Sequence, residues 1–261
     1  MTIYNNIGKG YSNTRRSDSR IVKTLLDILK AAEISTIADI GAGTGSYAYA
    51  LANHDYNVIA IEPSETMRSQ AISHPNIEWI NAYAESLPLS HRSVDAAIII
   101  LAMHHFKNYR QALKEAYRIT NNGSIIIFTY DPRMISDFWL TVYFPSLITD
   151  VKATFVPIDR LVSDLENITS QAINVTPFLI PNDLVDSFAA VGWSKPELYL
   201  DSNIRQGISS FSKIKSLELN DGLSRLKKDL DSGKWEQKYQ HLRSQNNYDA
   251  GYRFVHTTGF Q

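Results

Sequence analysis

The chain has 261 residues, of which 44% are hydrophobic and 20% charged, and its formal net charge at pH 7 is −1. This composition is typical of a folded globular protein and excludes a disordered or fibrous one. The 26 lysines and arginines are balanced by 27 acidic residues, so the strong basic excess of a protein that binds a phosphate backbone is absent. We therefore expect no nucleic acid as a partner. We expect no membrane either, because the longest apolar run, Ala96–Met103, is too short to span one.

Cysteine is absent from the sequence, which excludes disulfides, thiolate metal sites and a cysteine nucleophile. Residues 1–10 are polar and lack the apolar region of a secretory signal. These observations predict a cytoplasmic protein without a metal centre. The length predicts one α/β domain, residues 1–261, with a small elaboration.

Strands and helices alternate along the first half of the chain. Apolar residues at helical spacing predict a first helix over Arg20–Ala32, capped by Ser17 or Ser19. The elements expected after it are strands at 35–40, 56–62, 77–82, 94–103 and 124–130, and helices at 46–53, 64–73 and 109–118. This alternation predicts a mostly parallel sheet. The nearly unbroken apolar run of the fourth strand predicts that it lies in the centre.

The alternation is lost after residue 131, where prolines separate short helical patches. We interpret this region as a helical cap inserted after the fifth strand of a core that covers residues 20–131. The remaining expected elements are a cap over 132–190 and 204–247, with its last two helices broken at Gly233, and two further core strands at 195–201 and 252–258.

A glycine-rich segment, Asp39-Ile40-Gly41-Ala42-Gly43-Thr44-Gly45, follows the first strand. Glycine has no Cβ, so the backbone can approach a ligand closely at the carboxyl edge of the sheet. The spacing G-x-G-x-G differs from the dinucleotide motif G-x-G-x-x-G, whose third glycine would fall on Ser46. About 20 residues after the loop begins, Glu62 ends the second strand, where an acidic side chain can bind two ribose hydroxyls. Loop and acid together predict a cofactor site, and the spacing of the glycines argues against NAD.

These segments resemble the class I S-adenosylmethionine-dependent methyltransferases, whose acidic-x-G-x-G-x-G motif is matched by Asp39, Gly41, Gly43 and Gly45. In this resemblance Glu62 is the ribose-binding acid. The resemblance covers most of residues 11–131. It implies a Rossmann-like, seven-stranded, mostly parallel sheet flanked by helices, S-adenosyl-L-methionine as the cofactor, and a small molecule as the methyl acceptor.

The resemblance also implies roles for segments outside the glycine loop. Residues 81–88 are similar to the adenine-contacting loop of the family, although Tyr83 stands where the family usually has an aspartate. Tyr11 and Arg15 belong to a segment similar to one that folds over the cofactor in related enzymes, and a guanidinium can donate two parallel hydrogen bonds to the cofactor's carboxylate. The expected cofactor-binding residues are Tyr11, Arg15, Asp39, Gly41, Ala42, Gly43, Gly45, Glu62, Pro63, Ala84, Glu85 and Leu101.

Several residues have a structural alternative. Asp39 can order the glycine loop by accepting backbone amides, and Arg15, next to Arg16, can be an ordinary surface side chain. His104 and His105 end the fourth strand, and consecutive side chains of an extended segment face opposite ways, so we do not expect them to ligate one metal. One of them can serve as a general base, but shaping the strand end is the favoured role. The catalytic base is therefore left unassigned.

Two further features concern the ends of the sheet. Asp95, at the start of the fourth strand, lies at the edge opposite the glycine loop, and we interpret it as structural. Four aromatic residues follow the fifth strand: Phe138, Trp139, Tyr143 and Phe144. They can wall an apolar acceptor pocket, but the core of the cap is the favoured role for most of them.

The predicted function is methyl transfer from S-adenosyl-L-methionine to a small organic molecule, for which the resemblance suggests secondary metabolism as one setting. Methylation of RNA or protein is the first alternative. It predicts an Asn/Asp-Pro-Pro-Tyr/Phe motif after the fourth strand or a basic appendage, and the sequence has neither. An NAD-dependent oxidoreductase and a non-catalytic cofactor-binding protein are further alternatives. The acceptor, the atom methylated and the oligomeric state do not follow from the sequence.

Overall fold

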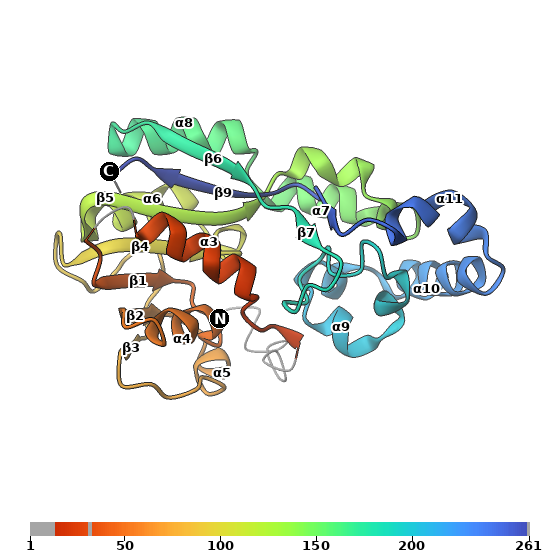
Figure 1. Cartoon of the computed structure of the whole chain (residues 1–261), viewed down its shortest axis with the longest axis horizontal. Helices are drawn as coiled ribbons and strands as arrows, with labels where there is room; N and C mark the ends of the chain where they lie inside the picture. The colour runs from red at the N-terminus through yellow and green to blue at the C-terminus, as the bar shows by residue number, and fades with distance from the viewer. Residues whose placement is uncertain (1–13, 31–32, 260–261) are drawn as a thin grey trace.

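The computed structural model describes residues 14–30 and 33–259. Its centre is a seven-stranded sheet in the order β3-β2-β1-β4-β5-β9-β6 (Figure 1). The strands are β1 (Thr36–Ile40), β2 (Asn57–Ile61), β3 (Ile77–Ile80), β4 (Val94–Ile100), β5 (Thr120–Tyr130), β6 (Ile173–Pro177) and β9 (Tyr252–Thr257). Strands β1 to β5 pair in parallel, whereas β9 pairs antiparallel with both β5 and β6. The mostly parallel sheet predicted from the sequence is confirmed.

Strand β4 occupies the middle of the sheet, as its apolar run predicted. Ile98 and Ile99 are both fully buried, because helices cover both faces. Strand β5 begins at Thr120, earlier than expected, and its pairing with β4 shifts register between Val94 and Ala96. Residues 120–123, which lie before the strand expected at 124–130, are therefore the irregular start of a longer strand.

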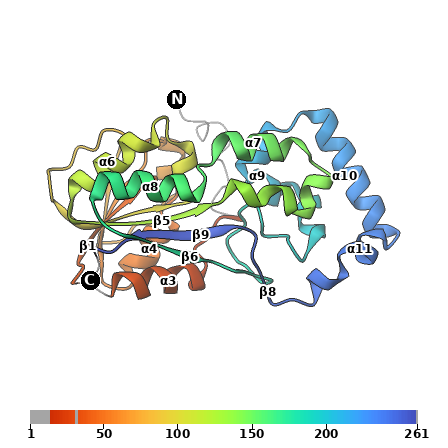
Figure 2. The ribbon, with the colours of Figure 1, turned by 90° about the horizontal axis from the view of Figure 1, so that it is seen from above.

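Helices α3 (Ser19–Leu29) and α4 (Ser46–Ala52) lie on one face of the sheet, and α6 (Tyr109–Ile119) and α8 (Ile158–Thr169) on the other (Figure 2). Helix α3 buries the apolar stripe that predicted it, with Ile21, Leu25 and Leu29 fully inaccessible. Its N-cap is neither Ser17 nor Ser19. The buried carboxylate of Asp18 accepts the Arg20 N–H at 2.9 Å instead, which satisfies one of the free amides of the first turn.

Helix α5 (Glu65–Arg68) is much shorter than the helix expected over 64–73. Ser64 caps it, because its side chain accepts the amide of Met67. Directly after it, the amides of Gln70 and Ala71 bond to carbonyls three residues back, and the chain leaves the helix before Pro75.

The prediction of a strand at 195–201 is wrong. Residues Pro196–Leu200 form a 3-10 helix, η4, in which the amides of Leu198 and Asp201 bond to carbonyls three residues earlier. The sheet is completed instead by β6, which lies within the region expected to be cap. This strand was missed because it is an edge strand: four of its five residues are exposed, so it lacks apolar alternation, and it ends on a proline that only an edge tolerates.

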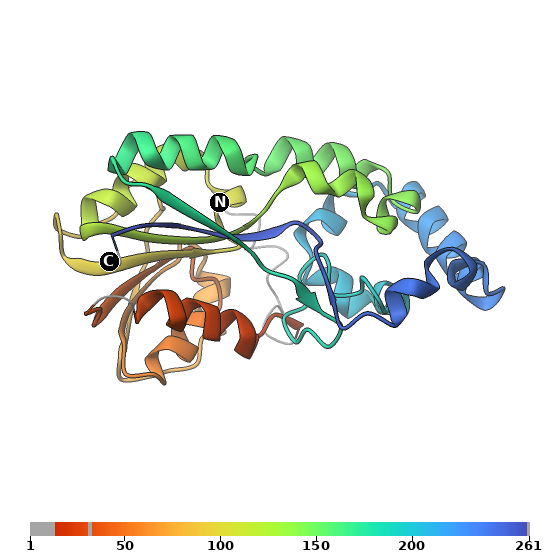
Figure 3. The ribbon, with the colours of Figure 1, turned by 45° about the horizontal axis from the view of Figure 1, so that its top comes forward.

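The predicted cap boundary of 132–190 is therefore corrected, because α8 and β6 belong to the core. The cap lies beyond the carboxyl ends of the parallel strands (Figures 1 and 3). It consists of α7 (Ser146–Thr154), α9 (Ser202–Gln206), α10 (Ser216–Asp231), α11 (Lys234–Arg243), a small β7 (Ile180–Pro181) and β8 (Asn247–Tyr248) ribbon, and the 3-10 segments η2 (Pro132–Asp137), η3 (Trp139–Val142), η4 and η5 (Ser209–Lys213).

The cap has an aromatic core of its own. Trp139 donates its Nε1–H to the carbonyl of Trp193 at 2.8 Å and packs edge-on against Trp235. The predicted helix break at Gly233 is confirmed, since this residue has a φ of +74° and starts α11. None of the helices in the described ranges is long and apolar enough to cross a membrane.

Candidate active site

A cavity of about 570 Å³ lies at the carboxyl ends of β1, β2 and β4. Strand β1 lies next to β4 although β2 and β3 follow it in the chain, and ligands of open α/β sheets bind where the strand order reverses in this way. The wall opposite the sheet comes from the cap, through Ala153 and Thr154 of α7 and Lys213 of η5. The cavity is thus shared between core and cap.

The glycine loop forms the floor of this cavity. Gly43 has a φ of +60° and lines the cavity, and a Cβ at this position would meet only the flexible end of Met67, at 3.4 Å. Gly45 has a different function, because a Cβ there would lie 2.6 Å from the ring of Trp79. Gly43 therefore leaves room for a ligand, whereas Gly45 leaves room for the protein's own packing.

Glu62 closes one end of the loop from the tip of β2. Its two carboxylate oxygens accept the amide of Gly43 at 3.1 Å and the amide of Ser64 at 2.8 Å. Burial raises the pKa of Glu62, and these two amides oppose the rise. The side chain is buried, yet it lines the cavity and can accept hydrogen bonds from further donors there.

Asp39 is buried at the end of β1 and does not line the cavity. Burial first, and the nearby carboxylate of Glu62 second, raise the pKa of Asp39 to about 7. The amide of Gly43, in the middle of the glycine loop, donates to Glu62. The loop-ordering role considered for Asp39 falls to Glu62.

The segment after β3 forms the next part of the wall. Ala82, Tyr83, Ala84 and Glu85 all line the cavity. Tyr83 is 46% exposed, and the Lys107 ammonium lies 5.3 Å from the centre of its ring. Glu85 accepts the amide of Asn108 at 3.0 Å, which ties this segment to the start of α6.

Arg15 is not an ordinary surface side chain. Its Nε–H donates to Asp186, a second N–H reaches the other carboxylate oxygen at 3.4 Å, and the guanidinium lines the cavity. Asp186 is only 1% exposed and also accepts the hydroxyl of Tyr47 at 2.9 Å. No sequence pattern predicted this role for Asp186, because the residue lies in a cap loop without a motif. Tyr11 lies outside the described residues.

His104 and His105 do not face opposite ways. They lie in a short 3-10 helix, η1 (Met103–His105), with ring centres 3.8 Å apart, and both line the cavity. The expectation of opposite faces is wrong because it assumed an extended backbone. Burial, followed by nearby positive charge that includes Arg15 and Lys213, lowers the pKa of His104 well below its usual range and that of His105 to about 4. Both rings are therefore neutral at pH 7.

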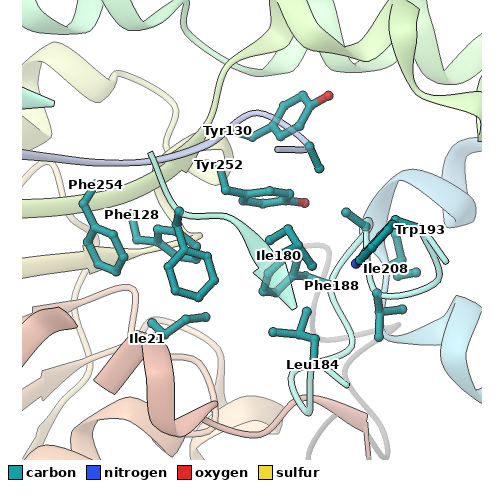
Figure 4. Close-up of a cluster of buried hydrophobic side chains, with 14 of the residues drawn as sticks. Ile21, Phe128, Tyr130, Ile180, Leu184, Phe188, Trp193, Ile208, Tyr252 and Phe254 are labelled. Atoms are coloured by element: carbon teal, nitrogen blue, oxygen red, sulfur yellow. The ribbon is translucent and has the colours of Figure 1, made fainter. Parts of the chain in front are cut away.

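A second cavity of about 70 Å³, which we call the inner chamber, adjoins the first. The two share Arg15, Leu101 and His104. The other chamber walls come from the end of β5, the cap and the start of β9, and their larger side chains are Tyr130, Ile135, Phe138, Val151, Phe155, Phe188, Ile208 and Tyr252. Figure 4 shows several of them, with Tyr130, Phe188, Ile208 and Tyr252 gathered at the boundary between sheet and cap. Phe138 is thus a wall of the chamber.

The structure brings most of the expected site residues together. The expected residues that line the 570 Å³ cavity are Arg15, Gly41, Ala42, Gly43, Glu62, Pro63, Ala84, Glu85, Leu101, His104 and His105. Asp39 and Gly45 do not line it. Sequence reasoning missed Tyr47, Met67, Thr154, Asp186 and Lys213 in this cavity, and Tyr130 and Phe155 in the inner chamber.

At the opposite edge of the sheet, Asp95 accepts the amides of Ser35 at 3.0 Å and Thr36 at 2.9 Å and the side-chain amide of Asn121 at 3.0 Å. These bonds join the starts of β1, β4 and β5. The structural role predicted for Asp95 is confirmed.

Comparison with known proteins agrees with this geometry. Residues 38–128 match the family model described as a methyltransferase domain. One similar protein of known crystal structure comes from Anabaena variabilis and is described as a candidate methyltransferase from an antibiotic biosynthesis pathway. Its sequence is 44% identical, the match covers 94% of this chain and 99% of the Anabaena chain, and the two structures superpose with a TM-score of 0.90. A candidate methyltransferase from Dictyostelium discoideum is 24% identical over 247 residues, 85% of this chain and 89% of its own.

A ubiquinone/menaquinone biosynthesis C-methyltransferase from Rubrivivax gelatinosus is 34% identical over 89 residues, which cover 33% of this chain and 36% of that protein. The match to the Anabaena protein extends over nearly the whole chain, and the family model matches the segment that carries the glycine loop and Glu62. The chain belongs to the class I S-adenosylmethionine-dependent methyltransferases.

Proposed function

We propose that this methyltransferase acts on a small organic molecule bound in the inner chamber. The observation that carries the proposal is the position of the chamber, which adjoins the 570 Å³ cavity through Arg15, Leu101 and His104 and is otherwise walled by cap and sheet. An acceptor in the chamber borders a cofactor in the larger cavity. A site of this kind, apolar and beneath a cap, suits a small ligand better than a nucleic acid or a protein chain.

The residues of the larger cavity fit S-adenosyl-L-methionine. Its volume of about 570 Å³ is in the range of cofactor sites. The buried Glu62 carboxylate accepts one amide at each oxygen and has lone pairs left for ribose hydroxyls. Gly43 leaves room for close approach of the ligand, and the cavity-lining guanidinium of Arg15 suits a carboxylate. We assign these three residues to cofactor binding, with Pro63, Ala84, Glu85 and Leu101 as apolar and backbone contacts.

When bound, the cofactor supplies a methyl carbon that its sulfonium makes electrophilic. The protein's task is to hold the acceptor in line with that carbon. Well-oriented reactants reach effective molarities of about 10⁵ to 10⁸ M, so positioning accounts for much of the rate. His104 and His105 are poor bases because their lowered pKa values leave them little affinity for a proton. Their neutrality also avoids repulsion of a positively charged sulfonium.

The names of the similar proteins support a small acceptor. The Anabaena protein is assigned to an antibiotic biosynthesis pathway, and the Rubrivivax protein is named for methylation in ubiquinone and menaquinone biosynthesis. We therefore extend the proposal to an acceptor from secondary metabolism. A macromolecular acceptor is less well supported, because the net charge of −1 provides no basic excess for RNA.

The test is transfer of radiolabelled methyl groups from S-adenosyl-L-methionine into an extract of the source cells, which is then separated by size. Label in the small-molecule fraction supports the proposal. Label confined to RNA or protein overturns it. The Glu62→Ala variant is the matched control, because it should lose the label in every fraction if transfer depends on the assigned cofactor site.

A further inference from the structure

One wall residue of the inner chamber has a hydroxyl group that forms no hydrogen bond within the described protein. Tyr130, the last residue of β5, is 6% exposed and forms part of the chamber wall. Its hydroxyl is buried and has no hydrogen-bond partner among the described residues. Figure 4 shows the hydroxyls of Tyr130 and Tyr252 pointing the same way, away from the sheet and towards the cap.

The other buried tyrosines of the described chain are all paired. The hydroxyls of Tyr47, Tyr143 and Tyr199 donate to Asp186 at 2.9 Å, Asp229 at 2.9 Å and the Ala189 carbonyl at 2.7 Å. Tyr252 lies beside Tyr130, with ring centres 5.0 Å apart, and its hydroxyl forms a hydrogen bond with the backbone of Ala190. Buried polar groups are nearly always paired, so the lone exception among these five residues requires an explanation.

The surroundings of Tyr130 define what can bind it. The rings of both Tyr130 and His104 contact Phe155, with ring centres at 5.6 Å and 4.3 Å, so Phe155 connects Tyr130 to the histidine that borders the cofactor cavity. The charged side chain of the chamber wall, Arg15, is paired with Asp186. An additional charge would be desolvated there without a partner, which disfavours a charged acceptor group.

We infer that the Tyr130 hydroxyl hydrogen-bonds to an oxygen atom of the methyl acceptor, so that the acceptor is an uncharged, mainly apolar molecule that carries a hydroxyl or carbonyl group. This inference rests on the proposed function and names the chemical class of its substrate. The chamber volume of about 70 Å³ is half of the roughly 150 Å³ cavity that accommodates benzene in an engineered protein. Only part of the acceptor therefore lies in the chamber, and the rest extends towards His104 and the cofactor cavity.

The first experiment compares binding of phenol and toluene, which have the same size, to the protein saturated with S-adenosylhomocysteine. We expect calorimetry to show phenol binding about tenfold more tightly than toluene, and Tyr130→Phe to abolish this preference. The control is Tyr143→Phe, which removes a hydroxyl outside the chamber and should keep the preference. Equal affinities in the wild type, a preference that persists in Tyr130→Phe, or binding of neither molecule at millimolar concentration would overturn the inference.

Thermal unfolding of the ligand-free protein provides a second, independent measurement. Tyr130→Phe should unfold at the same temperature as the wild type or above it, because no internal hydrogen bond is lost. Tyr143→Phe should unfold at a lower temperature, since it loses the bond to Asp229. A decrease in Tyr130→Phe as large as that in Tyr143→Phe would mean that the hydroxyl has a protein partner, and the inference would fail.

The label-transfer experiment separates the two proposals. Label in small molecules together with an unchanged KM for the labelled acceptor in Tyr130→Phe would refute this inference and leave the proposed function intact. Label confined to macromolecules would refute the proposed function itself.

Discussion

The buried carboxyl group of Asp39 should make the stability of the protein depend on pH. Burial, and then the carboxylate of Glu62, raise the pKa of Asp39 from its usual 3.8 to about 7. Between these two values the folded state keeps a proton that the unfolded chain has lost. The stability that this proton provides is complete below pH 3.8 and is lost progressively as the pH rises to about 7.

The two pKa values differ by about three units, and one unit corresponds to about 1.4 kcal/mol, so the free energy of unfolding should fall by up to about 4 kcal/mol over this range. Asp39→Asn keeps the size of the side chain and removes its charge. We expect the variant to match the wild type near the acidic end of the range. Above pH 7 it should be the more stable protein by several kcal/mol.

The assay is urea unfolding of the ligand-free protein at a series of pH values, with the difference between variant and wild type plotted against pH. The raised pKa of Glu62 acts in both proteins and contributes little to this difference. Asp27→Asn, which removes a carboxylate from an exposed position, is the control for the loss of one charge. A flat difference for Asp39→Asn would refute the reasoning, because it would mean that Asp39 ionises as it does in the unfolded chain.

Three further predictions concern the site. Glu62→Ala and Gly43→Val should each weaken binding of S-adenosylhomocysteine about tenfold or more in calorimetry, because one loses the acceptor proposed for the ribose hydroxyls and the other obstructs the loop. Unchanged affinity in both variants would refute the cofactor assignment. Asp186→Ala removes the buried carboxylate that pairs with Arg15 and should lower the free energy of unfolding by about 3 kcal/mol, measured by urea unfolding. An unchanged urea midpoint would contradict the ion pair. The rate of methyl transfer should show no histidine step between about pH 6 and 8, since the pKa of His105 is about 4 and that of His104 is also lowered; a step that disappears in His104→Gln would show that this residue is a base after all.

Structural features are predicted best from the sequence where their physical cause lies within a short segment of the chain. The apolar run of β4 identifies a strand buried on both faces, and the stripe of α3 identifies its buried side. The glycine loop and Glu62 were identified for the same reason, because close backbone approach and an acid at a strand end leave a pattern of residue types. Strand β4 lies in the middle of the sheet, α3 buries its apolar stripe, and Gly43 and Glu62 line the cavity.

The missed features depend on contacts between distant segments. Asp186 pairs with Arg15, which lies 171 residues earlier in the chain. The residues next to each partner show no pattern that predicts this ion pair. Strand β6 is held by β9 at an edge of the sheet, so its exposed side chains carry no alternation. The pairing of His104 with His105 depends on a single 3-10 turn that follows a strand, and an apolar run does not reveal where a strand ends.

The larger part of the cap, residues 178–251, leaves and rejoins the core at one point of the sheet. Pro177 at the end of β6 pairs with Arg253 near the start of β9, so the intervening segment begins and ends on neighbouring antiparallel strands. Because its ends are held together by the sheet, this segment can change in length or sequence at little cost in loop-closure entropy and without moving the glycine loop. Much of the inner-chamber wall, including Phe188 and Ile208, lies within it. Exchange of residues 178–251 between relatives is therefore a natural route to a different acceptor, as long as Asp186, the buried partner of Arg15 in the cofactor cavity, is retained.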